Sequence, residues 1–216
     1  MADIIITCEH SSPHIPNMYR GKMLIPNNID EHRVYDKGAF EAAENFACIK
    51  GGSVIDFPCS RLLIDANRSI TNSSLFSKYS AGLPSVDRYT LIEEIYIPFR
   101  MKTVKAVEKS AKAIHLSFHS YTPVLNGKVR NYDAGILYDP SRGEEAELAG
   151  NLIKHMNSHG IRTVANRPYK GTADGHTTAL RKEFPADRYI GIEIELSQKF
   201  SVKEMIGIST EIASFF

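Results

Sequence analysis

The chain has 216 residues, enough to bury a substantial hydrophobic core, and we expect a single domain spanning residues 1–216. Hydrophobic residues make up 43% of it and charged residues 24%, which is typical of folded proteins and excludes a disordered chain. Because 26 basic residues face 25 acidic ones, the net charge of +1 argues against binding of nucleic acid by bulk electrostatics, although a local group of cations can still hold a small anion.

The cysteines and the apolar runs indicate the compartment. Cys8, Cys48 and Cys59 are an odd number without CxxC spacing, so neither a disulfide scaffold nor a cysteine zinc site fits. No signal-like segment opens the chain, and its apolar runs fall far short of the roughly 20 residues that span a bilayer. We therefore expect a cytoplasmic protein that is not bound to a membrane.

The first part of the chain alternates between strand and helix patterns. Residues 3–10 form an apolar run that turns polar before Ser-Ser-Pro, which predicts a buried strand ending in a loop. The pattern then predicts a helix over 28–50 and strands over 53–57 and 62–64. Residues 70–87 are rich in Ser, Asn and Gly without a clear period, so we expect a long loop there and a candidate lid.

The alternation continues to the end of the chain and sets the fold class. The pattern predicts a helix over 88–113 interrupted at Pro98, strands over 114–119, 135–138, 161–164 and 189–196, helices over 144–159 and 202–216, and a Gly-rich polar loop over 166–177. Strands that alternate with helices predict an α/β fold with a mostly parallel sheet.

Two histidines stand at the ends of predicted strands. His10 and His119 are expected to meet, because the carboxyl ends of parallel strands share one edge of the sheet. Two imidazoles with a carboxylate and an open position are the usual ligands of a catalytic zinc. No compact metal motif fixes this interpretation, and solvated loop histidines are the alternative.

Several carboxylates are candidates for the same site. Glu9, Glu31 and Asp36 all lie near the first predicted helix, and residue chemistry alone does not choose among them. Glu193 and Glu195 share one face of a predicted strand because side chains alternate with a period of two. In a central strand these carboxylates need a compensating metal, arginine or proton, whereas an edge strand would leave them solvated.

Arginines suggest an anion site. Residues 60–68 bring together Arg61, Asp65, Asn67 and Arg68, and arginine binds carboxylates through two parallel hydrogen bonds. A structural arginine–aspartate network is the alternative. The remaining histidines are weaker metal candidates, among them His14, His32, His115, His155, His159 and His176.

These segments together resemble the N-formylglutamate amidohydrolase family over most of the chain. The motifs that carry the resemblance are CEHSS at 8–12 with Ile15-Pro16, HRVYDKG at 32–38, SRLLIDANR at 60–68, LSFHSYTP at 116–123, GILY at 135–138, NRPYKG at 166–171 and GIEI at 191–194. The resemblance implies a three-layer α/β/α sandwich, similar to exopeptidases that use zinc, with a mixed and mostly parallel sheet.

The resemblance also implies roles for particular residues. His10, Asp36 and His119 would bind one divalent metal ion, zinc in the first instance, and Glu193 matches the catalytic glutamate of the family. The expected reaction is hydrolysis of a small anionic acyl-amino acid, N-formyl-L-glutamate, to L-glutamate and formate. Substrate contacts are expected from Arg61, Asn67, Arg68, Ser120, Arg130 and Tyr169.

Two positions depart from the family pattern. Glu195 stands where relatives often have arginine, and Arg100 stands where they commonly have histidine. These departures leave the substrate open. The alternatives are a related metal hydrolase acting on another acyl-amino acid or small peptide, and a non-catalytic domain that binds an anion.

Overall fold

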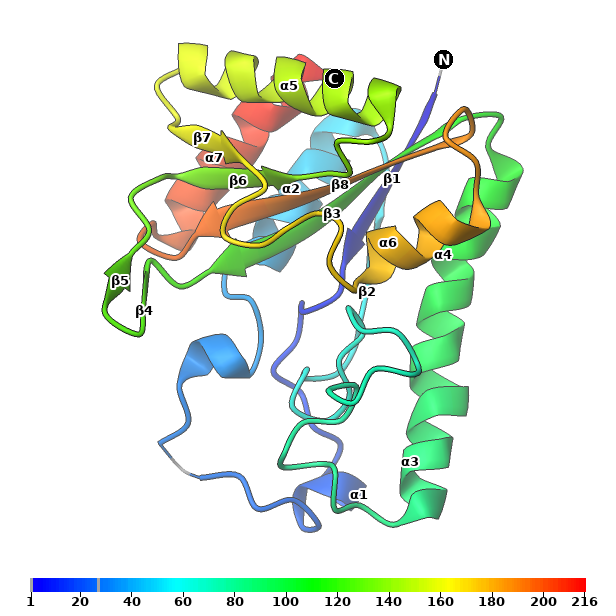
Figure 1. Ribbon diagram of the computed structural model, residues 1–216. Coiled ribbons are helices and arrows are strands. Elements are labelled where there is room, and N and C mark those ends of the chain that lie inside the picture. Colours follow the sequence, from blue (N-terminus) through cyan, green and yellow to red (C-terminus); the bar gives the residue numbers. More distant parts are fainter. Residues whose placement is uncertain (1, 27) are drawn as a thin grey trace.

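A mixed sheet of six strands forms the centre of the computed structural model, which describes residues 2–26 and 28–216 (Figure 1). The strand order is β2-β1-β3-β8-β6-β7. The strands are β1 (Asp3–Cys8), β2 (Val54–Asp56), β3 (Ala113–Tyr121), β6 (Ala134–Leu137), β7 (Thr163–Ala165) and β8 (Tyr189–Ser197). β2, β1, β3 and β8 run parallel, whereas β6 is antiparallel to β8 and parallel to β7. A separate short hairpin pairs β4 (Val124–Leu125) with β5 (Lys128–Val129).

Helices cover both faces of the sheet, so the expected α/β/α arrangement is confirmed (Figure 1). One face packs against α2 (Ala39–Lys50), α5 (Gly143–Ser158) and α7 (Val202–Phe215). The other packs against α4 (Ile97–Lys109) and α6 (His176–Glu183). The remaining helical segments are α1 (Asn17–Arg20), the 3₁₀ turn η1 (Glu31–Arg33), α3 (Ser85–Leu91) and the π turn η2 (Ile92–Tyr96). Across the described ranges, no helix has both the length and the apolar character to cross a membrane.

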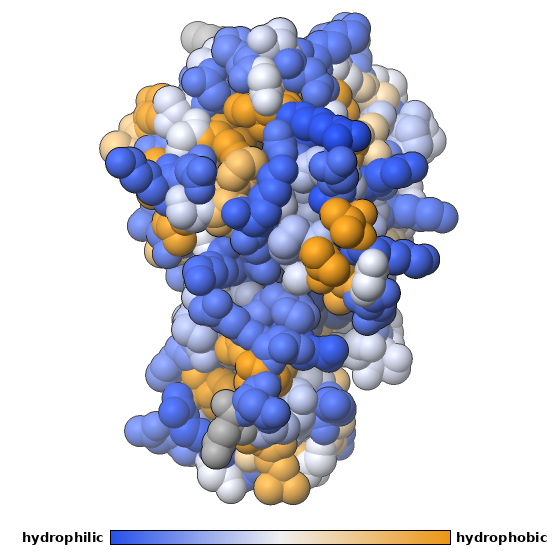
Figure 2. Space-filling view, turned by 90° about the vertical axis from the view of Figure 1, so that its left-hand side faces the viewer, coloured by the Kyte–Doolittle hydropathy of each residue, from blue (hydrophilic) through white to orange (hydrophobic). Residues whose placement is uncertain are grey.

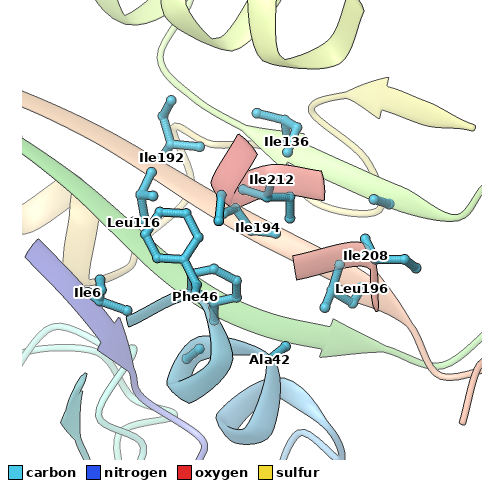
Figure 3. Close-up of a cluster of buried hydrophobic side chains, with 14 of the residues drawn as sticks. Ile6, Ala42, Phe46, Leu116, Ile136, Ile192, Ile194, Leu196, Ile208 and Ile212 are labelled. Atoms are coloured by element: carbon cyan, nitrogen blue, oxygen red, sulfur yellow. The ribbon is translucent and has the colours of Figure 1, made fainter. Parts of the chain in front are cut away.

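The two faces of β3 and β8 differ in chemistry. Leu116, Ile192 and Ile194 point toward α2 and α7, where they meet Phe46 and Ile212 in the main hydrophobic core (Figure 3). Because successive side chains of a strand point to opposite faces, the residues between these apolar ones lie on the other face. That opposite face carries the polar residues of the candidate site.

Three expectations from the sequence need correction. The helix expected over 28–50 begins only at Ala39, because Gly38 has φ 80° and precedes the helix in a left-handed conformation. The strand expected over 62–64 is a turn, although Leu63 and Ile64 are buried in a second hydrophobic cluster. This apolar run therefore marked burial and not a strand. Helix α6 lies partly within the expected 166–177 loop and was missed.

The segment expected as a long loop is irregular as far as Pro84, and α3 begins at Ser85. Its apolar residues Leu75 and Leu83 pack with Phe99 of α4 in the second cluster. The interruption expected at Pro98 lies slightly earlier, because the π turn η2 ends at Tyr96 and Pro98 stands in the first turn of α4. A lid function of this loop stays a prediction.

Candidate active site

His10, Asp36 and His119 come from three separate segments and meet at the carboxyl ends of β1 and β3. His10 follows β1, and His119 lies within β3. The Nδ1 atoms of His10 and His119 lie 3.2 and 2.9 Å from the same oxygen, Asp36 Oδ2. All three side chains are buried. We refer to these residues as the His–Asp–His triad.

Backbone contacts place Asp36 between the two histidines. Its N–H donates to the carbonyl of His10 at 2.9 Å, and the N–H of Ser120 donates to Asp36 Oδ2 at 3.3 Å. The chain then turns at Gly38, where an added Cβ would clash with the sulfur of Met205 in α7. The late start of α2 therefore leaves Asp36 in a loop that reaches the ends of β1 and β3.

Each imidazole of the triad has a second carboxylate behind it. His10 Nε2 lies 2.7 Å from Asp65 Oδ1, and His119 Nε2 lies 3.2 Å from Glu9 Oε2. Histidines that bind metal almost always donate their other ring N–H to a carboxylate, a carbonyl or water, which fixes the ring and its tautomer. The triad has this arrangement at both histidines.

The charges around the triad favour a cation. Burial opposes ionisation of Asp36, but His10, His119 and Arg61 hold its pKa well below the usual range. Burial likewise opposes protonation of His119, yet Asp36 and Glu9 raise its pKa well above that of a free imidazole. The carboxylates that would keep protons on the imidazoles would also stabilise a divalent ion in their place.

The spacing of the triad also fits a metal ion. Two ligand atoms bound at about 2.0–2.1 Å to a tetrahedral zinc lie about 3.3 Å apart. The contacts of Asp36 Oδ2 with the two Nδ1 atoms, at 3.2 and 2.9 Å, are close to that separation. Of the other carboxylates considered from the sequence, Glu9 lies behind His119, and Glu31 bonds to Tyr35 and Lys37 in an exposed position. Asp36 is thus the carboxylate that faces both imidazoles.

Glu193 and Glu195 lie beside the triad in the interior of the sheet. β8 is flanked by β3 and β6, so the edge-strand alternative is wrong. Glu193 pairs in register with Ser117, and Glu195 pairs with His119. Thr177 of α6 donates a hydrogen bond of 2.5 Å to Glu193 Oε1 and thereby holds this carboxylate in place.

A cavity of about 240 Å³ connects these groups. All predicted site residues except Arg130 line it, namely His10, Asp36, Arg61, Asn67, Arg68, His119, Ser120, Tyr169 and Glu193. Glu195, Lys170, Ala173 and Asp174 complete the lining. The face of the molecule in Figure 2 is largely hydrophilic where its broad upper part meets the narrower lower part.

Arg130 lies in an adjoining cavity. That cavity, of about 430 Å³, shares Arg61, Arg68 and Tyr169 with the first. The guanidinium of Arg130 lies 5.5 Å from the ring centre of Tyr169 and 5.7 Å from that of Tyr121, within cation–π range. A ligand that fills both cavities would therefore pass from the triad toward Arg130.

The arginine–aspartate network considered from the sequence is present. Arg61 donates to Asp36 at 3.3 Å and to Asp65 at 3.1 Å. Arg68 donates to the carbonyl of Asp174 at 3.0 Å and keeps about a third of its side chain exposed. Arg61 therefore balances the charge of two aspartates while it lines the cavity. Arg68 donates to a neutral carbonyl and is the cation more available to an anionic ligand.

Another buried network lies behind the triad. Glu9 accepts hydrogen bonds from Thr7 and Ser117, both at 2.6 Å, and lies 2.8 Å from His176 Nδ1. His115 contacts Thr7 and Tyr189, both at 2.7 Å. Burial lowers the pKa of His115 to about 3 and that of His176 to about 4, so both imidazoles are neutral.

The other weak metal candidates do not line the cavity that holds the triad. His155 and His159 group with Glu211 near the ends of α5 and α7, His14 lines neither cavity, and His32 lines only the adjoining cavity that holds Arg130. Arg100 is also outside the cavity lining, and it donates to the carbonyl of Ala66 at 3.2 Å.

The fold is an α/β/α sandwich whose site has the residues to hold a metal ion, and comparison with known proteins identifies the family. The model of the N-formylglutamate amidohydrolase family matches residues 2–201, so the chain belongs to this family. It is accordingly a hydrolase that acts on amide bonds. A search of the curated proteins found no match.

Solved structures share the fold. The gene product Atu2144 from Agrobacterium tumefaciens superposes with a TM-score of 0.84 at 24% identity, covering 99% of this chain and 88% of that one. N-formylglutamate amidohydrolase from Ralstonia eutropha JMP134 gives a TM-score of 0.67 at 15% identity, covering 98% and 90%. The cell shape determinant protein Csd4 from Helicobacter pylori gives 0.53 at 14% identity, covering 99% of this chain and 49% of that one. At these identities the likeness establishes the fold alone.

Proposed function

We propose that this protein is a metal-dependent amidohydrolase that cleaves the amide of a small N-acylated acidic amino acid. The first reaction to test is hydrolysis of N-formyl-L-glutamate to L-glutamate and formate. The observation that supports this proposal most directly is the His–Asp–His triad, with a carboxylate behind each imidazole and Glu193 in the same cavity. We further infer that it acts in the cytoplasm, in keeping with its three free cysteines.

The triad would hold the metal, and zinc suits its two nitrogen donors and one carboxylate oxygen. When bound, a divalent ion of this kind polarises an amide carbonyl and lowers the pKa of water. Asp65 and Glu9 would orient His10 and His119 so that both Nδ1 lone pairs face the ion.

Glu193 would act as the general base and then as the general acid. Its Oε1 atom is held by Thr177, which leaves Oε2 to take a proton from the attacking water. The same carboxyl group would return that proton to the leaving amine nitrogen. The proton therefore passes from water to product through one side chain that lines the cavity.

The cations of the cavity would bind the carboxylates of the substrate. Arg68 and Tyr169 lie at the junction of the two cavities, and Arg130 lies in the outer one. Asn67 and Ser120 line the inner cavity. A neutral analogue would cover these arginines without giving them a carboxylate partner, and the loss of that partner discriminates against it.

The test combines metal analysis with an assay of formate release. We expect purified protein to bind close to one equivalent of zinc and to release formate from N-formyl-L-glutamate. Glu193→Ala should retain the metal and lose turnover by at least about 100-fold, because general base catalysis contributes about 10²–10⁴-fold. Turnover equal to that of the wild type would remove Glu193 from the mechanism.

A second variant tests the metal site itself. His119→Ala should lose zinc, because it removes one of the three proposed ligands. Full zinc retention by this variant would contradict the ligand set. If the wild type binds no metal and hydrolyses no acyl-amino acid, the non-catalytic anion-binding alternative would replace the proposed function.

A further inference from the structure

Glu195 is a buried carboxylate in the cavity wall for which the described part of the chain shows no partner. Its side chain lies in the lining of the cavity and is 4% exposed. No hydrogen bond or ion pair to it is found among residues 2–26 and 28–216; its Oε2 atom is fully buried, which leaves Oε1 as the oxygen that a group in the cavity can reach. An isolated buried carboxylate is costly unless a cation, a hydrogen-bond donor or a proton compensates it.

The other acidic groups of the site already have partners. Asp36 and Asp65 face Arg61 and the imidazole of His10, and Glu193 accepts a hydrogen bond from Thr177. Asp174 accepts hydrogen bonds from the backbone of Ser69 and the side chain of Asn72. Glu195 is thus the acidic group of the cavity whose interactions are incomplete. An incomplete group at this position indicates a ligand that brings its own donor.

The described residues of the neighbouring strands make no hydrogen bond or ion pair with the Glu195 carboxylate. On β3 its register partner is His119, whose ring nitrogens already face Asp36 and Glu9. On β6 its register partner is Gly135, which has no side chain and makes room for the carbonyl of Arg167. The cavity in front of Glu195 is therefore the direction from which a donor can arrive.

The position of Glu195 also indicates which part of a substrate this carboxylate would contact. It sits next to a proposed metal ligand, so it lies near the carbonyl of the amide that is cleaved. In an aminoacyl group, the ammonium nitrogen is two bonds from that carbonyl carbon. The carboxylates of the departing amino acid would extend instead toward Arg68 and the outer cavity.

We propose that Glu195 binds the ammonium group of an aminoacyl substrate, so that the preferred substrate is a small dipeptide with an acidic C-terminal residue. This inference rests on the proposed function, because it names the acyl group cleaved at the same site. The two ends of the substrate would then meet opposite charges: its ammonium group would meet Glu195, and its carboxylates would meet Arg68. A formyl or acetyl derivative would leave Glu195 unpaired.

The test uses two ligands that differ only in one ammonium group, glycyl-L-glutamate and N-acetyl-L-glutamate. Their affinities are measured by calorimetry at neutral pH on metal-stripped protein, where no hydrolysis intervenes. We expect the wild type to bind the dipeptide at least about tenfold more tightly, as a hydrogen-bonded charge pair would give. Glu195→Gln should bring the ratio close to one, and Glu195→Met provides a second variant should the first fold poorly.

Glu193→Gln is the matched control, because it removes the other carboxylate of the same strand face. It should keep the preference for the dipeptide. Equal binding of the two ligands by the wild type would overturn the proposal, and so would a preference that persists in both Glu195 variants.

Kinetics on the zinc-loaded protein distinguish a failure of the role proposed for Glu195 from a failure of the proposed function. We expect the wild type to show a higher kcat/KM for glycyl-L-glutamate than for N-acetyl-L-glutamate, and Glu195→Gln to lose that difference. If neither compound, nor N-formyl-L-glutamate, is hydrolysed, the proposed function fails. The binding ratio on metal-stripped protein still decides the role of Glu195 in that case.

Discussion

Replacing Glu9 by glutamine tests whether the buried network behind the triad tunes the metal site. Glu9 Oε1 faces Thr7 and His176, and Oε2 faces Ser117 and His119. Glutamine has nearly the same shape but only one acceptor oxygen, and its NH₂ group is a donor. In either amide orientation, two of these four neighbours would face an NH₂ group in place of an oxygen.

The structure sets the size of the effect. Each buried donor left without an acceptor costs about 1–3 kcal/mol, so Glu9→Gln should lower the free energy of unfolding by about 2–6 kcal/mol. For a chain of this length, each kcal/mol shifts Tm by about 2–4 °C. Loss of the carboxylate behind His119 should also weaken zinc binding by about 10–100-fold, as for other carboxylates that orient metal-binding histidines.

The assay measures zinc affinity and stability separately. Zinc is titrated into metal-stripped protein in competition with a chelating indicator, and urea unfolding is followed without zinc because bound metal itself stabilises the folded state. Thr7→Val is the matched control: it removes a hydroxyl that bonds to Glu9 and His115 but does not contact the triad. It should lower stability and leave zinc affinity nearly unchanged.

Two results would refute this reasoning. Unchanged zinc affinity in Glu9→Gln would show that Glu9 does not orient His119. An equal loss of zinc affinity in Thr7→Val would show that general loosening of the network, and not the missing carboxylate, weakens the site.

Three further changes have defined outcomes. Both imidazoles of the triad have raised pKa values, so metal-free protein should lose stability as the pH rises through those values, which urea unfolding across the pH range checks. Zinc affinity should instead fall as the pH is lowered, because protons compete for the same nitrogen atoms, and zinc titration across the pH range checks this. Arg61→Met leaves Asp36 and Asp65 without their guanidinium and should lower the free energy of unfolding by about 3–5 kcal/mol. Bound zinc should restore part of this loss, so a gain in Tm with zinc no larger than that of the wild type would contradict the prediction. Gly38→Ala places a residue with a Cβ in a left-handed conformation against Met205 and should lower the free energy of unfolding by at least about 1 kcal/mol. Thermal unfolding unchanged from the wild type would show that this position accepts a Cβ without strain.

The sequence predicted the parts of the site that follow from strand periodicity. The apolar runs that end in polar residues placed His10 and His119 at one edge of the sheet, and the period of two placed Glu193 and Glu195 on one face. The choice of Asp36 came from the resemblance to the family. The geometry supports that choice through the contacts of Asp36 Oδ2 with both imidazoles.

Other parts of the site depend on contacts between distant segments, which periodicity does not encode. The pairing of Asp65 with His10 joins positions 55 residues apart, and that of Glu9 with His176 joins positions 167 apart. Thr177, which holds Glu193, lies at the start of a helix that the sequence pattern missed. In β3, His115 and His119 are four residues apart, and this even spacing was a signal that both share one face of the strand.

The pairing of β3 with β8 has a consequence for assembly of the protein. Ser117 and His119 share one face with Glu193 and Glu195, and the apolar residues between them fill the opposite core. A slip of one residue in either strand would push charged groups into that core and expose isoleucine and leucine to the cavity. The residues assigned to catalysis therefore also penalise misfolded pairings of the central strands. Selection for chemistry and selection for correct folding act on the same positions.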